Sequence, residues 1–161
     1  PLGTHARLIK ARDAASRTLT ASPMSDLSPK RHDKLYYMRL GSLDAPDLLG
    51  FELLNSGGGQ IGAALIRLGS SASSLVTLRC EGLPLVPSSV AAIGAALRTM
   101  DVHRLSSMVI RDTPYAAALA QGGFLSRRDS ARYVMTLGLT DTGRAAASAM
   151  ASSAIEKIDM D

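Results

Sequence analysis

The stretch that decides the fold runs from Asp112 to Arg128 and reads D-T-P-Y-A-A-A-L-A-Q-G-G-F-L-S-R-R. Its Asp-Thr start supplies side-chain oxygens that cap a helix, and the following Pro114 suits the first helical position, which needs no backbone donor. The Gly pair predicts the end of that helix, with Gly123 in the left-handed conformation. Phe124 then opens a strand, and we expect its ring to be buried.

Three elements are predicted directly before this stretch. S-L-V-T-L-R-C over Ser74–Cys80 alternates in the manner of a strand, and Pro84 and Pro87 stop extended pairing after it. A helix follows, with Ser88 or Ser89 as the expected N-cap and an apolar face running to residue 100. Residues 105–111 form the next strand.

Further strands and a final helix are predicted on both sides of this region. The remaining expected elements are strands over Leu35–Leu43, Leu48–Leu54 and Arg132–Leu139 and an Ala-rich final helix over Gly143–Ile158. Ile61–Leu68 is either a return strand or a short helix, because a brief apolar run does not distinguish the two. Together these elements predict an α/β domain with one mixed sheet over residues 35–161.

Residues 1–34 differ from this body in composition. They begin with Pro1-Leu2-Gly3, which is typical of a cleaved tag, and continue with a predicted basic helix over residues 5–19 and an irregular connector. Residues 1–40 hold eight Lys/Arg and three acids, so all of the net charge of +4 originates there. We expect a basic N-terminal arm that is dispensable for folding.

Composition excludes several classes of protein. With 46% hydrophobic and 20% charged residues, the 161-residue chain is an ordinary globular domain, and no apolar run is long enough for a membrane span. Residues 41–161 offer no basic, aromatic-lined face for nucleic acid. The single cysteine, Cys80, forms no internal disulfide, which favours a cytoplasmic protein. The histidines, His5, His32 and His103, are not spaced as metal ligands, so we expect no metal.

The order of elements from Ser74 onward, and above all Asp112–Arg128, resembles the C-terminal half of the GNAT acyltransferase family. Gly50–Arg67 is similar to the central hairpin of that family, so the resemblance covers residues 35–139. It implies a sheet that opens where two parallel strands diverge, with the pantetheine of acetyl-CoA or another acyl-CoA lying between them. The acceptor implied is an amine on a small molecule or a protein.

Carried over to this chain, the resemblance places the cofactor on the strand residues Leu78, Arg79 and Cys80 and on Ser88 and Ser89 at the helix start. The turn between these groups lacks the phosphate-binding pattern of the family. Two prolines remove backbone donors, and a glutamate adds negative charge beside the expected phosphates. We therefore expect CoA to bind weakly or not at all, unless the side chain of Arg79 points into the opening.

Two acids and one hydroxyl are candidates for proton transfer. Glu81 follows the strand that lines the opening and is the better candidate for a base, and Glu52 lies within another strand. The family's tyrosine acid would stand at Leu119, whereas Tyr115 lies one turn earlier and is expected to pack in the core. Cys80 is expected to be a small buried hydrophobe.

A second location for a phosphate loop is Gly57–Leu65, G-G-G-Q-I-G-A-A-L, which superficially resembles a glycine-rich turn and helix. A hairpin turn is the other interpretation, with glycine serving a positive φ. The placement of the downstream elements favours the hairpin.

Two functions remain open. One is CoA-dependent acyl transfer to an amine, with a strand N–H stabilising the oxyanion. The other is a non-catalytic GNAT-like interaction or regulatory module of a larger protein, such as a polysaccharide-assembly protein. Fold alone does not separate them.

Overall fold

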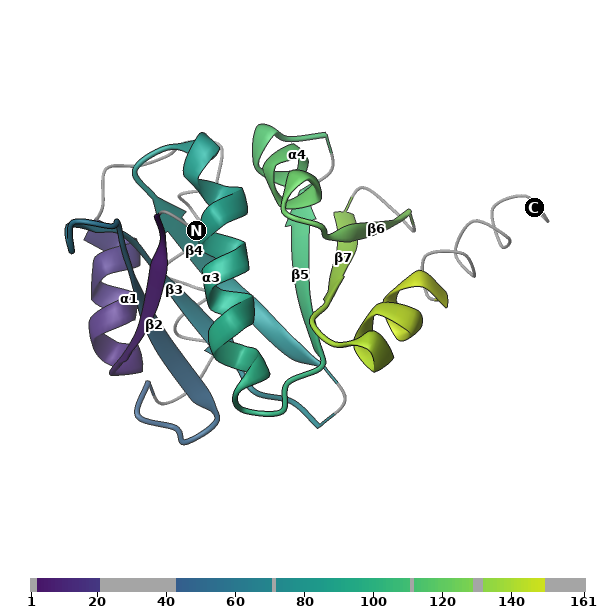
Figure 1. Ribbon diagram of the computed structural model, residues 1–161, viewed down its shortest axis with the longest axis horizontal. Coiled ribbons are helices and arrows are strands. Elements are labelled where there is room, and N and C mark those ends of the chain that lie inside the picture. Colours follow the sequence, from purple (N-terminus) through teal and green to yellow (C-terminus); the bar gives the residue numbers. More distant parts are fainter. Residues whose placement is uncertain (1–2, 21–42, 71, 111, 129–131, 150–161) are drawn as a thin grey trace.

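The computed structural model describes residues 3–20, 43–70, 72–110, 112–128 and 132–149, and these form one mixed α/β sheet with helices on both faces (Figure 1). The sheet order is β1-β2-β3-β4-β5-β7-β6. The strands are β1 His5–Ile9, β2 Leu48–Leu54, β3 Gln60–Arg67, β4 Ser73–Cys80, β5 Arg104–Ile110, β6 Leu125–Arg128 and β7 Arg132–Gly138. The labelled helices are α1 Ala11–Thr20, the 3-10 turn η1 Leu83–Leu85, α3 Val86–Arg98 and α4 Pro114–Gln121, and residues 141–149 are also helical.

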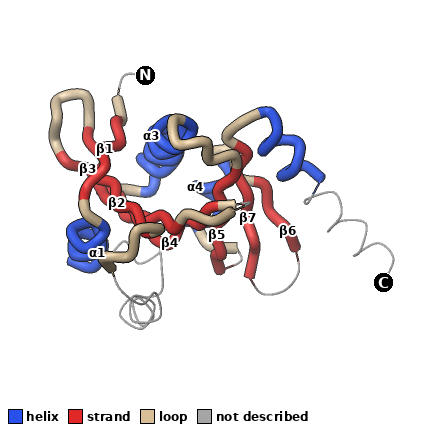
Figure 2. Tube along the Cα trace, turned by 90° about the horizontal axis from the view of Figure 1, so that it is seen from below, coloured by secondary structure: helices blue, strands red, loops and turns tan. Residues whose placement is uncertain are grey.

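Helices cover the two faces of the sheet unequally (Figure 2). Helices α3 and α4 pack on one face, and α1 packs on the other, against β2, β3 and β4. The larger core cluster, which includes Phe51, Ile93 and Leu119, lies on the α3 face. A smaller cluster on the α1 face joins Ala14 to Leu65. The two faces follow from the two-residue alternation of the strands.

Strands β4 and β5 form the only parallel pair of the described sheet, and they pair only at their start. Their register runs from Ser73 opposite Leu105 to Ser74 opposite Ser106, and no further pairs follow. The strands therefore diverge, and we call the opening between residues 75–80 of β4 and residues 107–110 of β5 the splay. The expected opening of the sheet between two parallel strands is confirmed.

The N-terminal segment differs from its prediction. A helix was expected over residues 5–19, but His5–Ile9 is an edge strand that pairs with β2 along its whole length, and the helix begins at Ala11. The expectation of an arm separate from the domain is wrong for residues 5–20, because they complete the sheet and cover its second face. Residues 21–34 lie outside the described residues.

Helix α1 approaches the sheet closely at Gly50. A Cβ atom at this position would lie 2.7 Å from the carbonyl oxygen of Lys10 and 2.8 Å from Cβ of Ala14. Ala14 and Ala15 are buried against β2 and β3. Small residues on both partners thus allow the helix to seat directly on the strand.

The glycine-rich segment after β2 is a hairpin turn. Strands β2 and β3 are antiparallel, so the open choice for residues 61–68 resolves as a strand. The side-chain oxygen of Asn55 accepts hydrogen bonds from the backbone N–H groups of Gly57 and Gly59, at 3.0 and 2.8 Å, and Gly58 has a φ of +84°. The hairpin interpretation is confirmed, and the glycines do not open a helix.

Helix α4 has the predicted start and end. Thr113 is the N-cap, and its side chain accepts a hydrogen bond from the backbone N–H of Ala116. Gly123 has a φ of +102°, and the backbone N–H of Phe124 donates to the carbonyl of Leu119 at 3.1 Å, which is a Schellman ending. Phe124 is 2% exposed, as expected.

The remaining predictions are confirmed in part. The strands expected at 48–54, 74–80, 105–111, 124–128 and 132–139 are all present, with no end shifted by more than one residue. The final helix was expected from residue 143, whereas residues 141–149 are helical, and the rest of it lies outside the described residues. The strand predicted over Leu35–Leu43 lies almost entirely outside them.

Candidate functional site

The free edge of β4 presents main-chain hydrogen-bonding groups to the splay. The backbone N–H of Glu81 donates to the carbonyl of Ile61 on β3 at 2.9 Å. Because successive residues of a strand turn their peptide groups to opposite edges, Arg79 also bonds toward β3, and Leu78 and Cys80 turn their N–H and C=O groups toward β5. Strand β5 does not reach them there, since its pairing ends at Ser74.

The side chains of Leu78 and Cys80 point to the α3 face. Both are buried in the larger core, and the Cys80 thiol lies 3.4 Å from the hydroxyl oxygen of Ser89 on α3. Burial raises the pKa of the Cys80 thiol to about 11, although its hydrogen bond with Ser89 acts in the opposite direction. Cys80 is therefore a protonated core residue at neutral pH, and only its backbone faces the splay.

The N-cap of helix α3 lies three or four residues earlier than predicted. Its N-cap is Leu85 and its first residue is Val86, so neither Ser88 nor Ser89 caps it. Ser88 is exposed, and its hydroxyl donates to the carbonyl of Leu85 at 3.1 Å and accepts from the hydroxyl of Thr4 at 3.0 Å. The preceding 3-10 turn extends the helical path backwards, which local N-cap signals did not predict.

The turn that leads into α3 uses its own backbone donors. The N–H of Leu85 donates to the carbonyl of Gly82 at 3.0 Å, and the N–H of Val86 donates to the carbonyl of Leu83. Pro84 and Pro87 have no N–H to offer. The helix start therefore has fewer amides for an anion than an ordinary N-terminus.

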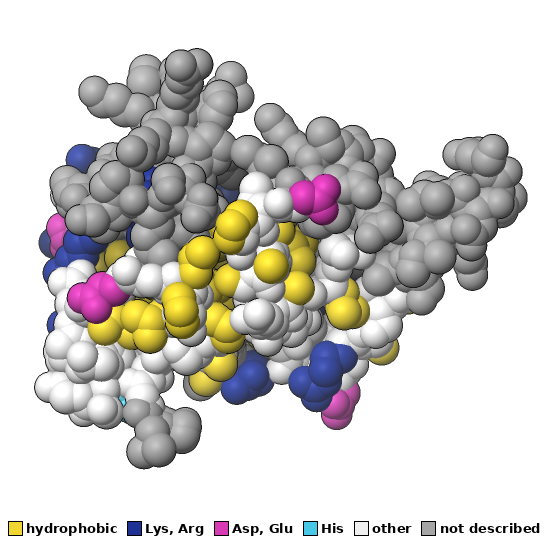
Figure 3. Space-filling model, turned by 90° about the horizontal axis from the view of Figure 1, so that it is seen from above, with side chains coloured by type: hydrophobic (Ala, Val, Ile, Leu, Met, Phe, Trp, Pro, Cys, Tyr) yellow, Lys and Arg dark blue, Asp and Glu magenta, His cyan; other side chains and the backbone are white. Residues whose placement is uncertain are grey.

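This end of the molecule is mainly apolar (Figure 3). Hydrophobic side chains form a band across the face seen from above, and both acidic and basic side chains lie at its borders. We define the mouth of the splay as Glu81, η1 and the first turn of α3. Pro84 is exposed, Leu83, Leu85 and Pro87 are half-buried, and η1 packs against both α3 and α4.

The side chain of Arg79 lies on the α1 face. It is 4% exposed and stands in a row across the sheet with Ala63 and Glu52, on the face opposite Leu78 and Cys80. Arg79 was expected to assist phosphate binding only if its side chain points into the opening, whereas the side chain is buried on the face opposite α3. Glu81 follows on the same face, and its side chain is exposed.

Tyr115 lies in the core beside the splay. It is 7% exposed, as predicted, and its neighbours include Cys80 and Ser107. Burial raises the pKa of the Tyr115 hydroxyl well above its usual range, the nearby Cys80 raises it further, and a hydrogen bond with Ser107 lowers it. Ser107 is also within 3.5 Å of the carbonyl oxygen of Leu75, so these hydroxyls stand where the strands part.

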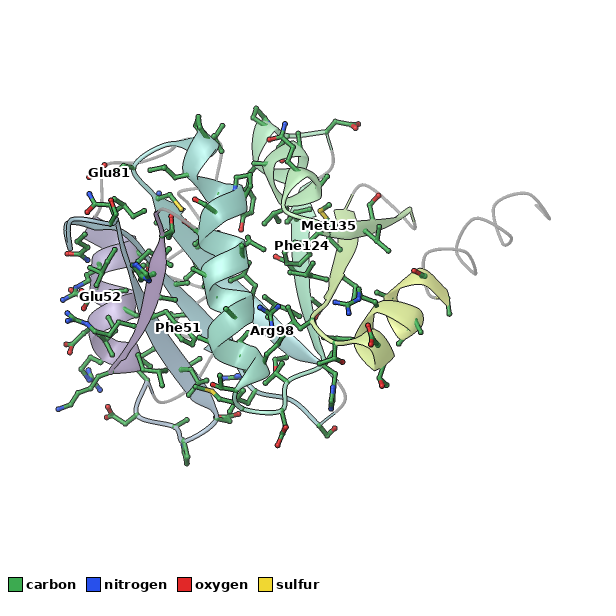
Figure 4. All side chains as sticks on the ribbon, viewed as in Figure 1. Phe51, Glu52, Glu81, Arg98, Phe124 and Met135 are labelled. Carbon is green, nitrogen blue, oxygen red and sulfur yellow. The ribbon has the colours of Figure 1, made fainter. Side chains whose placement is uncertain are left out.

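Glu52 is a buried charged residue whose partners were not foreseen (Figure 4). Arg7 of β1 approaches one carboxylate oxygen at 2.8 Å, and Arg17 of α1 approaches the other at 3.0 Å. Hydrogen bonding to Arg7 lowers the pKa of the Glu52 carboxyl, burial opposes this, and Arg17 lowers it further. With both oxygens occupied, Glu52 joins β1 and α1 to the sheet and is a poor base.

This arrangement predicts an acid-sensitive contribution to stability. Because the pKa of Glu52 is lowered in the folded state, its stabilisation is fully present above the unfolded value of about 4.3 and is lost as the pH falls through the folded value. We expect Glu52→Gln to cost about 1–2 kcal/mol at pH 7, since the arginines remain partly solvated. Urea unfolding of both proteins at pH 7 and pH 3 should give a difference that shrinks at low pH. A difference that is constant with pH would contradict this role.

Within the described residues, no group of three His, Cys, Asp or Glu side chains could hold a metal ion. No helix of this part of the chain is long and apolar enough to cross a membrane.

Three features identify the fold of this chain. They are the order of the strands in the sheet, the splay after the start of β4, and helix α3, which follows β4. No protein-family model and no curated protein matches the chain. Solved structures do match, among them several GNAT N-acetyltransferases. The described residues have the GNAT fold, as the resemblance implied.

Three of these structures illustrate the similarity. A Klebsiella pneumoniae protein assigned as an acyl-CoA N-acyltransferase has a TM-score of 0.59 at 18% identity, over 85% of this chain and 98% of that one. The Thermoplasma acidophilum PaiA N-acetyltransferase, in complex with coenzyme A, has a TM-score of 0.59 at 10% identity, over 84% and 98%. The Escherichia coli ribosomal-protein-S18-alanine N-acetyltransferase has 0.55 at 17%, over 85% and 94%.

Proposed function

We propose that this chain transfers an acyl group from a pantetheine thioester, such as acetyl-CoA, to an amine. The observation that carries the proposal is the free edge of β4, where the peptide groups of Leu78 and Cys80 face the splay. Pantetheine contains amide groups that can pair with such an edge in the manner of an added strand. The similarity to N-acetyltransferases, one of them in complex with coenzyme A, supports the same reaction.

The reaction requires few groups. The lone pair of a neutral amine attacks the thioester carbonyl carbon, the carbon–sulfur bond breaks, the nitrogen loses a proton, and the departing thiolate gains one. A backbone N–H of the β4 edge is suited to stabilise the oxyanion that forms between these steps.

Two residues are assigned to proton transfer. Glu81 is exposed at the end of β4 on the α1 face, beyond the strand edge that would hold the thioester, and it accepts the proton of the amine through water. Tyr115 is the hydroxyl proposed to protonate the thiolate. Its hydroxyl is protonated at neutral pH, as that of an ordinary tyrosine is, and it lies beside Cys80 and Ser107 at the splay. This extends the role in core packing that the sequence suggested for it.

A thermal-shift titration of the full chain with acetyl-CoA and CoA tests the binding step. A ligand present at 100 times its dissociation constant should raise stability by about 2.7 kcal/mol, which is a readily measured shift in Tm. Thiol release in the presence of an amine panel tests the transfer step. If no thioester shifts Tm and no thiol is released, acyl transfer is contradicted, and a non-catalytic GNAT-like module is the remaining function.

We expect Tyr115→Phe to reduce kcat about 100-fold with little change in the affinity for the thioester, because the hydroxyl acts only when the thiolate departs. Turnover by thiol release and binding by calorimetry should be measured together. Ser106→Ala is a matched control, since its hydroxyl lies 3.4 Å from the carbonyl of Ser73 at the paired start of the splay. Unchanged kcat in Tyr115→Phe would remove Tyr115 from the mechanism.

A further inference from the structure

The mouth of the splay differs in chemistry from the strand edge behind it. The edge offers peptide groups at Leu78 and Cys80, which suit an uncharged, amide-containing ligand. The mouth offers Leu83, Pro84 and Leu85, whose side chains are apolar and partly exposed. A complete CoA molecule would place pantetheine against the edge and its highly charged nucleotide at the mouth.

The mouth is unsuited to that nucleotide for three independent reasons. The N–H groups of Leu85 and Val86 are bonded within the turn, and two neighbouring positions are proline. Glu81 adds a negative charge at the end of β4. Residues 81–97 and 114–121, which form the turn, almost all of α3 and the whole of α4, contain no Lys or Arg. The nearest Arg on β4, at position 79, has its side chain on the other face.

We propose that the acyl donor is a thioester on a pantetheine arm that is recognised without the nucleotide of CoA. This rests on the proposed acyl transfer and narrows its donor. The amide groups of the pantetheine arm pair with the β4 edge. The apolar mouth contacts the group attached to the far end of the arm from the thioester. The same chemistry is carried by a small pantetheine thioester and by the phosphopantetheine arm of a carrier protein, which has one phosphate in place of a nucleotide.

Calorimetric titration of the full chain with pantetheine and with CoA tests this directly. We expect the two dissociation constants to agree within about threefold and neither ligand to bind more weakly at high salt, because no favourable phosphate contact contributes. A site that holds the phosphates would instead bind CoA about tenfold or more tightly for each charged hydrogen bond, with a marked loss in salt.

Two variants, each of which removes one carboxylate charge, test whether the nucleotide of CoA lies at the mouth. Glu81→Gln should tighten CoA about two- to fivefold relative to pantetheine, since it removes a like charge beside the nucleotide. Asp47→Asn is the matched control, because Asp47 is an exposed carboxylate at the opposite end of the sheet and should alter neither affinity. An equal effect of Glu81→Gln on both ligands would overturn the placement of the nucleotide at the mouth.

The outcomes separate the donor inference from the function on which it rests. CoA binding more than about tenfold tighter than pantetheine overturns the inference and leaves acyl transfer in place. Binding of neither ligand contradicts the function itself. Where pantetheine binds as expected, competition with a phosphopantetheinylated carrier protein and with its apo form identifies the source. Tighter binding of the modified form indicates a carrier protein, and weaker binding indicates a free thioester.

Discussion

Deletion of residues 1–20 is expected to abolish cooperative unfolding. The deletion removes β1 from the edge of β2 and removes α1 from the face of β2 and β3. It exposes Leu48 and Leu65, which are now buried, and leaves the Glu52 carboxylate without Arg7 and Arg17. An uncovered apolar sheet face with an unpaired edge also favours aggregation. Thermal unfolding followed by circular dichroism, with light scattering, measures both effects.

A point substitution tests the same packing without truncation. Gly50→Val should destabilise the protein by about 1–3 kcal/mol or more, because the added side chain would overlap Lys10 and Ala14 of the α1 segment. Gly57→Ala is the control, since only the Asn55 side chain lies near its Cβ position, at 3.5 Å. A soluble truncated protein with an intact cooperative transition would show that β1 and α1 are accessory.

Phe124→Ala is expected to cost about 3–5 kcal/mol, the range for removing a buried aromatic ring. Phe124 is 2% exposed and follows directly on the Schellman ending of α4, so its ring fixes both the helix end and the start of β6. In Figure 4 it lies beside Met135 of β7, which is also buried. Chemical denaturation gives the free energy of unfolding.

Leu125→Ala is the matched control for this substitution. Leu125 is the next residue along the chain and is 41% exposed, so its truncation should change stability by less than about 0.5 kcal/mol. Equal effects of the two substitutions would contradict the packing assigned to Phe124.

Local chemistry explains which elements the sequence predicts well. Thr113, Pro114 and Gly123 act within one turn of chain, so the bounds of α4 follow from capping rules alone. The strand at His5–Ile9 carries charged or polar residues on one side and has no local signal of its own. It forms only because β2, more than forty residues away, offers an edge, and no window of sequence contains both partners.

The candidate site likewise has some features that the local sequence predicts and others that depend on tertiary contacts. The residues expected to line the splay, Leu78 and Cys80, follow from the strand assignment, and alternation fixes their direction once β3 is known to pair. The face of the sheet on which the Arg79 side chain lies also follows from the pairing of β4 with β3, which the sequence alone does not give. The pairing of Glu52 with Arg7 and Arg17 depends on tertiary contacts across the missed strand and the relocated helix, so sequence reasoning treated Glu52 as a lone strand acid.

The most direct test of the central claim is amide hydrogen exchange, residue by residue, with and without saturating pantetheine thioester. We expect the N–H groups of Leu78 and Cys80 to become protected, since they face the splay and gain a partner. The N–H of Arg79, which already bonds toward β3, serves as the internal control and should not change. Binding that leaves Leu78 and Cys80 unprotected, or that instead protects Gly57 and Gly59, would contradict the claim.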